Sequence, residues 1–211
     1  RKTLRVATFG GLTALLLVGA VTRQAWAGAP AAQIKQSIDR AISVLQDPEL
    51  QGNSKIEERR AAIREIADET FDFEETAKRA LAAHWRKRTK REQEEFVQLF
   101  ADLWGHAGFF KIDEYGGERI VYLEEIVDGD RATVRTKIIM KKGPEVPVDY
   151  RMLRRGDRWM VYDVLVEGVS LVRNYRAQLN KIIRTSSYEA LVKKLKAKQT
   201  KAREQAIAAK R

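Results

Sequence analysis

The sequence of 211 residues contains no cysteine, only two histidines and only four prolines. Without cysteine the chain can form no disulfide bond and offers no thiol as a nucleophile or metal ligand. His84 and His106 lie 22 positions apart and lack the H-E-x-x-H pattern, so the sequence predicts no metal site. We interpret both histidines as surface or helix-end residues. A hydrophobic core must therefore supply the stability of the fold.

Phosphate-binding and membrane-spanning signals are also missing from most of the chain. No glycine-rich loop follows a predicted strand, and no apolar run after residue 27 is long enough to cross a bilayer. The run from Val6 to Val21 follows a basic N-terminus and ends before Ala25-Trp26-Ala27, which is typical of a signal peptide over residues 1–27. A membrane-anchoring helix is the alternative, although the run is short for a span of about 20 residues. We expect an exported protein whose mature chain begins near Gly28.

The formal net charge of +11 is concentrated at the two ends of the chain. Residues 1–27 carry four basic and no acidic side chains, whereas residues 193–211 carry eight basic side chains and one acidic side chain. Residues 28–192 carry 28 of each sign, so the expected folded body is neutral. Because nucleic-acid binding requires a basic surface on that body, we expect no nucleic-acid partner. Residues 199–211 are predicted to form a basic, solvated tail, and a weak attraction of this tail to anionic lipid is the alternative.

The first half of the mature chain has the periodicity of helices. Apolar residues recur at helical spacing up to Pro48 and again after Thr89, and the chain returns to this pattern after Ser170. An oxygen-bearing residue followed three positions later by glutamate is typical of a helix start, because the two residues cap each other's amides. Four such pairs predict helix starts: Ser54 with Glu57, Asp72 with Glu75, Thr89 with Glu92, and Ser186 with Glu189.

Between the helical parts the period changes to two. Residues 118–127, 131–141, 145–154 and 158–167 are rich in β-branched and aromatic side chains, and short turns with glycine separate them. Because short turns connect antiparallel neighbours, we predict a four-stranded meander. One face of it carries charges and the other must pack on helices or on a cargo. The predicted class is α+β, a twisted antiparallel sheet wrapped by helices and broadly NTF2-like.

Ser170 follows Gly168 by two residues and partly matches the G-x-S-x-G nucleophile elbow of hydrolases. The fifth position is Val172 instead of glycine, and neither histidine follows the serine. A predicted antiparallel sheet also lacks the βαβ units on which such an elbow sits. We therefore interpret Gly168 as a bend and Ser170 as a helix cap, and we predict no enzymatic activity.

Four collinear segments resemble the MlaC, or toluene-tolerance (Ttg2-type), family of periplasmic phospholipid-binding proteins. They are FDFEETAKRAL (71–81), HWRKRTKREQEEFVQLF (84–100), VPVDYRM (146–152) and WMVYDVLVEGVSLVRNYRAQLNKII (159–183). The resemblance extends from about Gln33 to Lys198. Ala82 departs from it, because the family often has glycine there. The segment RTSSYEALV (184–192) is similar to the hopanoid-associated branch of the family.

The resemblance implies that residues 28–198 form a carrier that holds phospholipid acyl chains in an apolar cavity between the sheet and the helices. It further implies shuttling between an inner-membrane MCE-domain ABC transporter and an outer-membrane lipoprotein complex, by a monomer without a cofactor. A diacyl lipid has on the order of 30 methylenes worth ~0.8 kcal/mol each, so a carrier must shield them from water. The candidate lining residues are Phe73, Leu81, Phe100, Leu103, Trp104, Val134, Ile138, Val148, Tyr150, Tyr162, Val164, Val169, Leu171 and Tyr175.

Other hypotheses remain open on the sequence alone. The cargo could be a hopanoid lipid, and the same apolar residues could fill the solid core of a periplasmic protein-interaction module. Arg173 and Arg176 are candidates for contact with a lipid head group.

Overall fold

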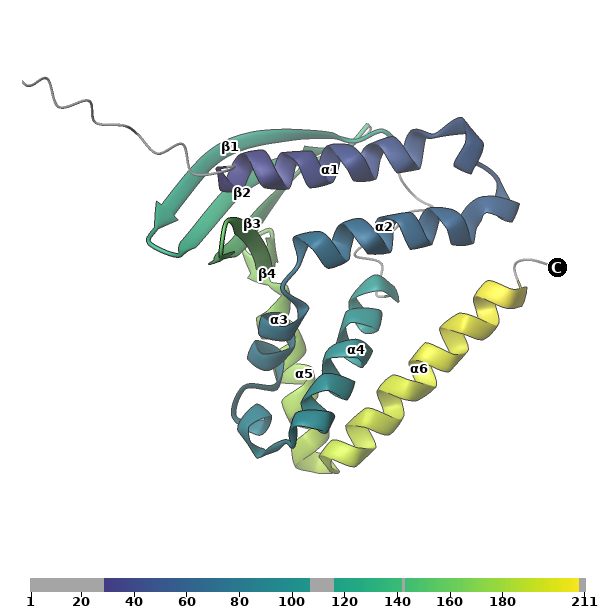
Figure 1. Cartoon of the computed structure of the whole chain (residues 1–211), viewed down its shortest axis with the longest axis vertical. Helices are drawn as coiled ribbons and strands as arrows, with labels where there is room; N and C mark the ends of the chain where they lie inside the picture. Colours follow the sequence, from purple (N-terminus) through teal and green to yellow (C-terminus); the bar gives the residue numbers. More distant parts are fainter. Residues whose placement is uncertain (1–28, 107–115, 142, 209–211) are drawn as a thin grey trace, which may run out of the picture.

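The computed structural model describes residues 29–106, 116–141 and 143–208, and the predicted signal peptide lies outside them. Figure 1 shows a hairpin of two helices beside the sheet and a second group of helices below it. Short 3₁₀ turns at Pro48–Leu50 and Asn53–Lys55 connect the hairpin, and a third at Ala82–Lys87 precedes α4. The helices are α1 (Pro30–Gln46), α2 (Ile56–Thr70), α3 (Phe73–Leu81), α4 (Lys90–His106), α5 (Leu171–Thr185) and α6 (Tyr188–Ala208).

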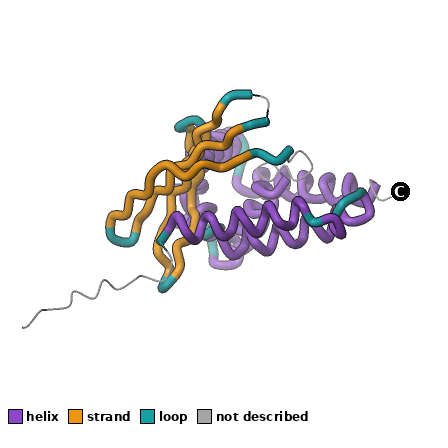
Figure 2. The backbone as a smooth tube through the Cα atoms, turned by 90° about the horizontal axis from the view of Figure 1, so that it is seen from above, coloured by secondary structure: helices purple, strands orange, loops and turns teal. Residues whose placement is uncertain are grey.

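The sheet is a five-stranded antiparallel meander in the order β1-β2-β3-β4-β5, and its four long strands lie in the predicted segments. Figure 2 shows that these strands bend along their length. Such bending accompanies the register shifts in β1 and β4, which leave Leu123 and Tyr162 as extra residues. The strands are β1 (Arg119–Asp128), β2 (Arg131–Ile139), β3 (Glu145–Arg155), β4 (Arg158–Val166) and β5 (Val169–Ser170).

The predicted count of four strands was one too few. Glu167 and Gly168 both have positive φ angles, 51° and 78°, which are the angles of a tight two-residue hairpin turn. This turn folds Val169 and Ser170 back onto the end of β4. A two-residue strand has no alternating pattern of its own, and glutamate is not a typical residue for a left-handed turn position.

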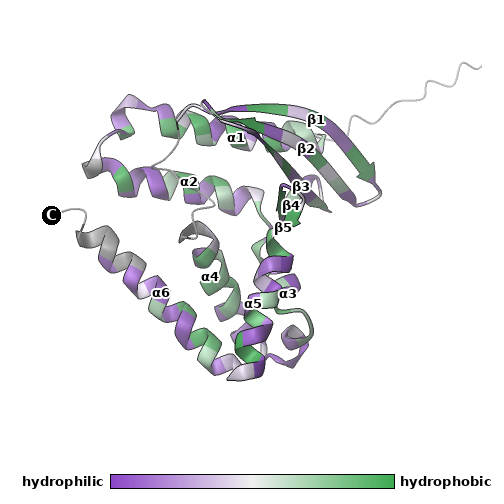
Figure 3. Cartoon of the chain, turned by 180° about the vertical axis from the view of Figure 1, so that it is seen from behind, coloured by the Kyte–Doolittle hydropathy of each residue, from purple (hydrophilic) through white to green (hydrophobic). Residues whose placement is uncertain are grey.

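The two faces of the sheet differ in polarity, as the alternation predicted. The strand register places Val134, Tyr150 and Val164 side by side, and all three are buried on the face that meets the helices. On the other face, Arg135 lies 2.6 Å from Glu124 and Lys137 lies 2.8 Å from Glu145. Figure 3 shows hydrophobic and hydrophilic stretches alternating along the strands and the helices.

Two of the predicted helix caps are confirmed. The Asp72 side chain accepts a hydrogen bond of 2.9 Å from the backbone N–H of Glu75 at the start of α3. At the start of α4 the Glu92 N–H donates to Thr89 Oγ1 (3.3 Å), and the Thr89 N–H donates to Glu92 Oε2 (2.7 Å). These hydrogen bonds hold the pKa of Glu92 below its ordinary value.

The other two caps were predicted wrongly. Ser54 lies inside a 3₁₀ turn, and α2 begins only at Ile56 with no side-chain cap. Ser186 ends α5, whereas its neighbour Ser187 caps α6 by accepting a 3.1 Å hydrogen bond from the Ala190 N–H. Two adjacent serines offer the same chemistry, so the sequence could not distinguish the end of one helix from the start of the next.

Helix α6 continues past Lys198, where the sequence predicted the tail to begin, and ends at Ala208. It packs along α4: Leu191 and Leu195 are buried, Tyr188 donates a 3.1 Å hydrogen bond to the Glu92 carbonyl, and Gln199 donates to Asp102. Within the described ranges, no helix combines the length and apolarity that crossing a membrane would require.

Candidate functional site

Five aromatic side chains from separate segments meet where α3, α4 and α5 approach the sheet. Phe71 and Phe73 both face Trp104, and their ring centroids lie 5.7 Å and 6.4 Å, respectively, from that of Trp104. Tyr175 contacts Phe100 at 5.4 Å and Trp104 at 6.3 Å. Edge-on arrangements dominate these contacts, as is usual for packed aromatic rings. The rings form one continuous apolar cluster, which we call the aromatic cluster.

Helix geometry explains how the aromatic cluster forms. Phe100 and Trp104 lie four positions apart on α4, so their side chains share one face of the helix. Phe96, four positions before Phe100, stacks on it with ring centroids 5.6 Å apart, and all three side chains are fully buried. Phe71 lies in the short connection between α2 and α3, where backbone contacts with β4 position it. It forms an isolated parallel bridge with Val161, next to a 2.8 Å hydrogen bond from the Asp72 N–H to the Val161 carbonyl.

The sheet supplies the other wall of the site. Four buried side chains of the sheet belong to the same hydrophobic cluster as the aromatic rings: Val134, Val148, Tyr150 and Val164. We call this larger set, the rings included, the apolar cluster. Twelve of the fourteen residues predicted from the sequence lie in this cluster. The buried members also include Leu81, Phe100 and Trp104, and the partly buried ones are Phe73, Leu103, Ile138, Leu171 and Tyr175.

The remaining two predicted residues lie elsewhere. Val169 is 60% exposed on β5, where it pairs with Val166 at the rim of the apolar face. Tyr162 is the extra residue at the register shift in β4, and the Arg79 guanidinium lies 4.1 Å above its ring. The structure therefore does not bring Tyr162 together with the other predicted residues.

Two functional candidates were missed in the sequence, Phe71 and Tyr122. Phe71 is the first residue of the FDF segment, next to the predicted site residue Phe73. Tyr122 alternates with Ile120 on the apolar face of β1. Both residues could therefore have been chosen from the sequence. The Tyr122 hydroxyl is buried and has no hydrogen-bond partner among the described residues. Burial raises the pKa of Tyr122, and it raises the pKa of Tyr150 to about 12, so both phenols stay neutral at physiological pH.

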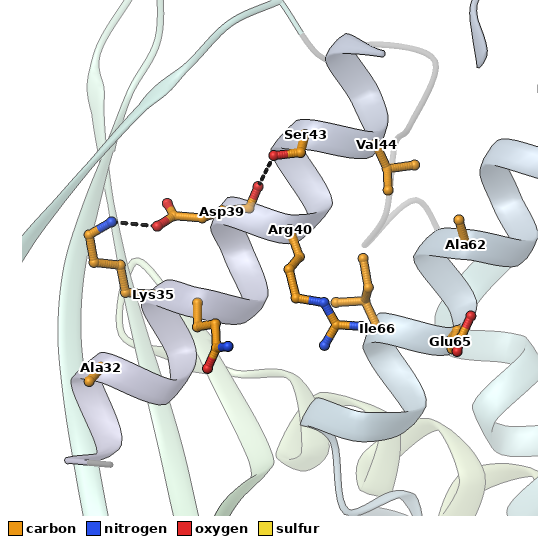
Figure 4. A pocket seen from close by; sticks show the side chains of 10 residues that line it. Ala32, Lys35, Asp39, Arg40, Ser43, Val44, Ala62, Glu65 and Ile66 are labelled. Carbon is orange, nitrogen blue, oxygen red and sulfur yellow. Dashed lines mark hydrogen bonds and ion pairs between the residues drawn. The ribbon is translucent and has the colours of Figure 1, made fainter. Parts of the chain in front are cut away.

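The side chains of the cluster pack against one another, and two hollows in the described part of the chain lie outside it. One, of about 640 Å³, runs between α1 and α2 (Figure 4). Its rim carries a Lys35–Asp39 ion pair of 2.5 Å, and Arg40 pairs with Glu69 at the same distance. The other, of about 340 Å³, lies between α4 and α6. Charged and apolar side chains together line both hollows, and neither hollow lies between the sheet and α3, α4 and α5, so neither matches the predicted apolar cavity.

Ser170 caps α5, as the sequence predicted. Its Oγ accepts a 3.0 Å hydrogen bond from the Arg173 N–H and donates one of 2.7 Å to Asp163. His84 does not serve this serine, because its ring nitrogen lies 3.0 Å from the side-chain oxygen of Asn180. In the part of the chain that the structure describes, no group of three or more histidine, aspartate or glutamate residues is placed to hold a metal ion.

The two arginines suggested for head-group contact lie on α5. Arg173 is exposed, and Arg176 donates a 2.9 Å hydrogen bond from Nε to the Arg79 carbonyl. Arg79 in turn covers Tyr162. The basic side chains therefore lie on the outer side of α3 and α5, away from the buried rings.

Comparison with known proteins places these features in a family. The family model described as MlaC protein matches residues 35–197. The chain is 25% identical to the intermembrane phospholipid transport system binding protein MlaC of Haemophilus influenzae, over 81% of this chain and 84% of that protein. It is 30% identical to the toluene tolerance protein ttg2D of Pseudomonas putida, over 44% of this chain and 41% of that protein. A phospholipid-binding protein from Ralstonia solanacearum, solved in complex with a phospholipid, has the same fold, with a TM-score of 0.71 at 20% identity, covering 82% of this chain and 98% of that one.

Proposed function

The chain belongs to the MlaC family, and from this premise we propose that it is a periplasmic carrier that binds phospholipid by its acyl chains and shuttles it between inner- and outer-membrane complexes. The relatives support the proposal, since their names specify phospholipid transport and toluene tolerance. The Ralstonia protein with the same fold was solved with a phospholipid bound.

The single observation that carries the proposal is the continuous apolar cluster between the sheet and the helices. Its helical wall is formed by α3, α4 and α5, and its sheet wall by β2, β3 and β4. Acyl chains that enter between these walls replace one set of apolar contacts with another. The side chains then remain out of water, while each lipid methylene gains ~0.8 kcal/mol by leaving it. Opening the packed cluster loses contacts between its side chains, and the acyl chains that enter supply apolar contacts in their place.

A polar group inside the cluster would contact the lipid near its ester linkages. The buried Tyr122 hydroxyl meets this requirement, because a donor without a partner among the described residues gains a full hydrogen bond when a carbonyl oxygen approaches. The head group would remain near solvent.

The experiment that tests the function is lipid transfer between vesicles. Donor vesicles carry a self-quenched fluorescent phospholipid, and acceptor vesicles carry none. The proposal predicts that the purified protein accelerates dequenching in proportion to its concentration. It also predicts that Tyr122→Phe slows transfer without lowering the free energy of unfolding. A transfer rate equal to that without protein contradicts the proposal.

Two alternatives have a specific observation in their favour. The RTSSYEALV segment forms the junction of α5 and α6 and favours a hopanoid cargo, which the mass of a co-purifying lipid would identify. The close packing of the aromatic cluster favours an interaction module with a solid core. Such a module would bind neither lipid and would be inactive in the transfer assay.

A further inference from the structure

The two edges of the sheet differ in how they are covered. Phe71 pairs with Val161 at one part of the β4 edge, and β5 covers another part. At the opposite edge, no backbone hydrogen bond joins β1 to any described residue outside its pairing with β2. The side chains of Leu123, Ile126 and Val127 on β1 are 52%, 42% and 51% exposed. An uncovered edge strand with exposed apolar side chains is a template for pairing with another strand.

The sequence of β1, RIVYLEEIVD, is complementary to itself in the antiparallel direction. When two copies are aligned about a twofold axis between Leu123 and Glu124, Arg119 of each copy lies opposite Asp128 of the other. In the same alignment, Ile120 lies opposite Val127, and Val121 lies opposite Ile126. Opposite charges and apolar pairs at directly opposed positions both stabilise antiparallel strands.

The register shift in β1 makes this alignment possible. Opposed residues must point to the same face, yet Ile120 and Val127 are seven positions apart and would point to opposite faces in a regular strand. The extra residue, Leu123, corrects the phase. Ile120 pairs with Ile138 and Val127 pairs with Ala132, and these partners are six positions apart on β2, so they share a face.

The two central glutamates already have partners inside each copy. Glu124 lies 2.6 Å from Arg135, and Glu125 accepts a 2.6 Å hydrogen bond from the Ala31 N–H at the start of α1. Their charges are therefore partly neutralised before two copies meet, which reduces the repulsion across the twofold axis.

We propose that β1 is a self-association edge, through which two copies of this chain pair antiparallel and join their sheets into one. The pairing uses ten residues from each copy. Stable interfaces use about 20–30 residues a side, so this dimer forms reversibly as the concentration rises, from the monomer that the family resemblance implies. Tyr122 of β1 faces the apolar cluster, whereas Val121 and Ile126 pair with Lys137 and Thr133 on the charged face of the sheet. The proposal does not depend on lipid binding.

Disulfide trapping tests the register directly, because the natural chain contains no cysteine. Val121→Cys and Ile126→Cys proteins are purified separately, mixed and mildly oxidised. Directly opposed residues have Cα atoms about 4.5–5.5 Å apart, within the range of a disulfide bond. In either variant alone the two thiols lie about 14 Å apart along the strand, because the β2 partners of Val121 and Ile126 are only four positions apart. We expect a cross-linked dimer in the mixture and its loss in each single variant. No cross-link in the mixture, or equal cross-linking in the single variants, overturns the proposal.

Sedimentation equilibrium of the unmodified chain gives a second, independent measurement. A lysine on an edge strand disfavours pairing, so Ile126→Lys is expected to lower the association constant by about tenfold or more. Met140→Lys, at another exposed apolar position beyond the end of β2, is the matched control and leaves the constant unchanged. A single monomeric species over the whole concentration range overturns the proposal.

Discussion

Ser170 donates a 2.7 Å hydrogen bond to Asp163, and this buried pair joins the end of the sheet to the first turn of α5. Asp163 also accepts a 3.1 Å hydrogen bond from the Val172 N–H, so one carboxylate connects the cap to the backbone that it caps. Helix α5 carries Leu171 and Tyr175 into the apolar cluster. The serine that partly matched a catalytic motif thus orients one wall of the candidate lipid site.

Loss of this pair should lower the free energy of unfolding. Removal of the Ser170 hydroxyl by Ser170→Ala leaves an N–H uncapped and takes one donor from a buried carboxylate, so we expect a loss of about 1–2 kcal/mol. Asp163→Ala removes the acceptor of two buried donors and should cost more, about 3 kcal/mol. Urea denaturation measures both. Thr89→Ala, at an exposed cap, serves as the reference for a cap without a buried partner, and a Ser170→Ala protein no less stable than that reference would refute the account.

Ala82 offers a stabilising substitution at the end of α3. Its backbone has φ 49° and ψ −119°, a conformation that only glycine adopts without strain. We expect Ala82→Gly to raise the free energy of unfolding by about 1 kcal/mol, because relief of strain outweighs the added entropy of the unfolded chain.

The neighbouring alanine supplies the control for that substitution. Ala83 is exposed in the same 3₁₀ turn but does not have a positive φ. Ala83→Gly should therefore lower the melting temperature in a thermal scan, whereas Ala82→Gly should raise it. If the two substitutions shift the midpoint in the same direction, backbone strain at Ala82 is not the cause.

Tyr150 should make the protein sensitive to alkaline pH. Burial raises its pKa to about 12 in the folded protein, whereas an unfolded tyrosine ionises near pH 10. The stabilising contribution of the neutral phenol is therefore complete below pH 10 and is lost as the pH rises from 10 towards 12. Tyr150→Phe should lose less stability than the natural chain between pH 9 and pH 11, by roughly 1 kcal/mol. Equal losses in urea titrations at the two pH values would show that this phenol does not titrate as the burial predicts.

Much of this arrangement could be predicted from sequence. Alternation predicted the four long strands and their charged outer face, and the pairs Asp72–Glu75 and Thr89–Glu92 predicted two helix starts that the structure confirms. These features depend on residues that are close in sequence. Twelve predicted site residues lie in one cluster, because the helical and strand periodicities that predicted the elements also determine which apolar side chains are buried.

Features that depend on distant contacts were not predictable in this way. The bridge between Phe71 and Val161 joins segments 90 positions apart. The lack of a hydrogen-bond partner for the Tyr122 hydroxyl among the described residues depends on side chains that are distant in the sequence. Tyr162 was predicted to line the site because the alternating sequence pattern does not reveal a register shift. The shift in β4 leaves Tyr162 without a partner on β3 and separates its side chain from the apolar cluster.

Val169 tests whether the rim of the apolar face takes part in lipid binding. It is largely exposed, so Val169→Glu should leave the free energy of unfolding nearly unchanged. A carboxylate at the entrance of an apolar site must be desolvated when acyl chains pass it, and we expect the amount of lipid retained through purification to fall severalfold. Met140→Glu removes similar exposed apolar area elsewhere and should retain lipid normally. Lipid extraction followed by phosphate analysis gives the ratio for each variant, and unchanged retention in Val169→Glu would exclude a role for this rim.

Native mass spectrometry of the purified protein tests the central claim most directly. The account predicts a species whose mass exceeds that of the chain by one phospholipid, and release of that lipid when the protein is unfolded. Delipidated protein incubated with phospholipid vesicles should regain the same added mass. Recovery of only the bare chain, both before and after incubation with vesicles, would contradict the assignment of this cluster as a lipid site.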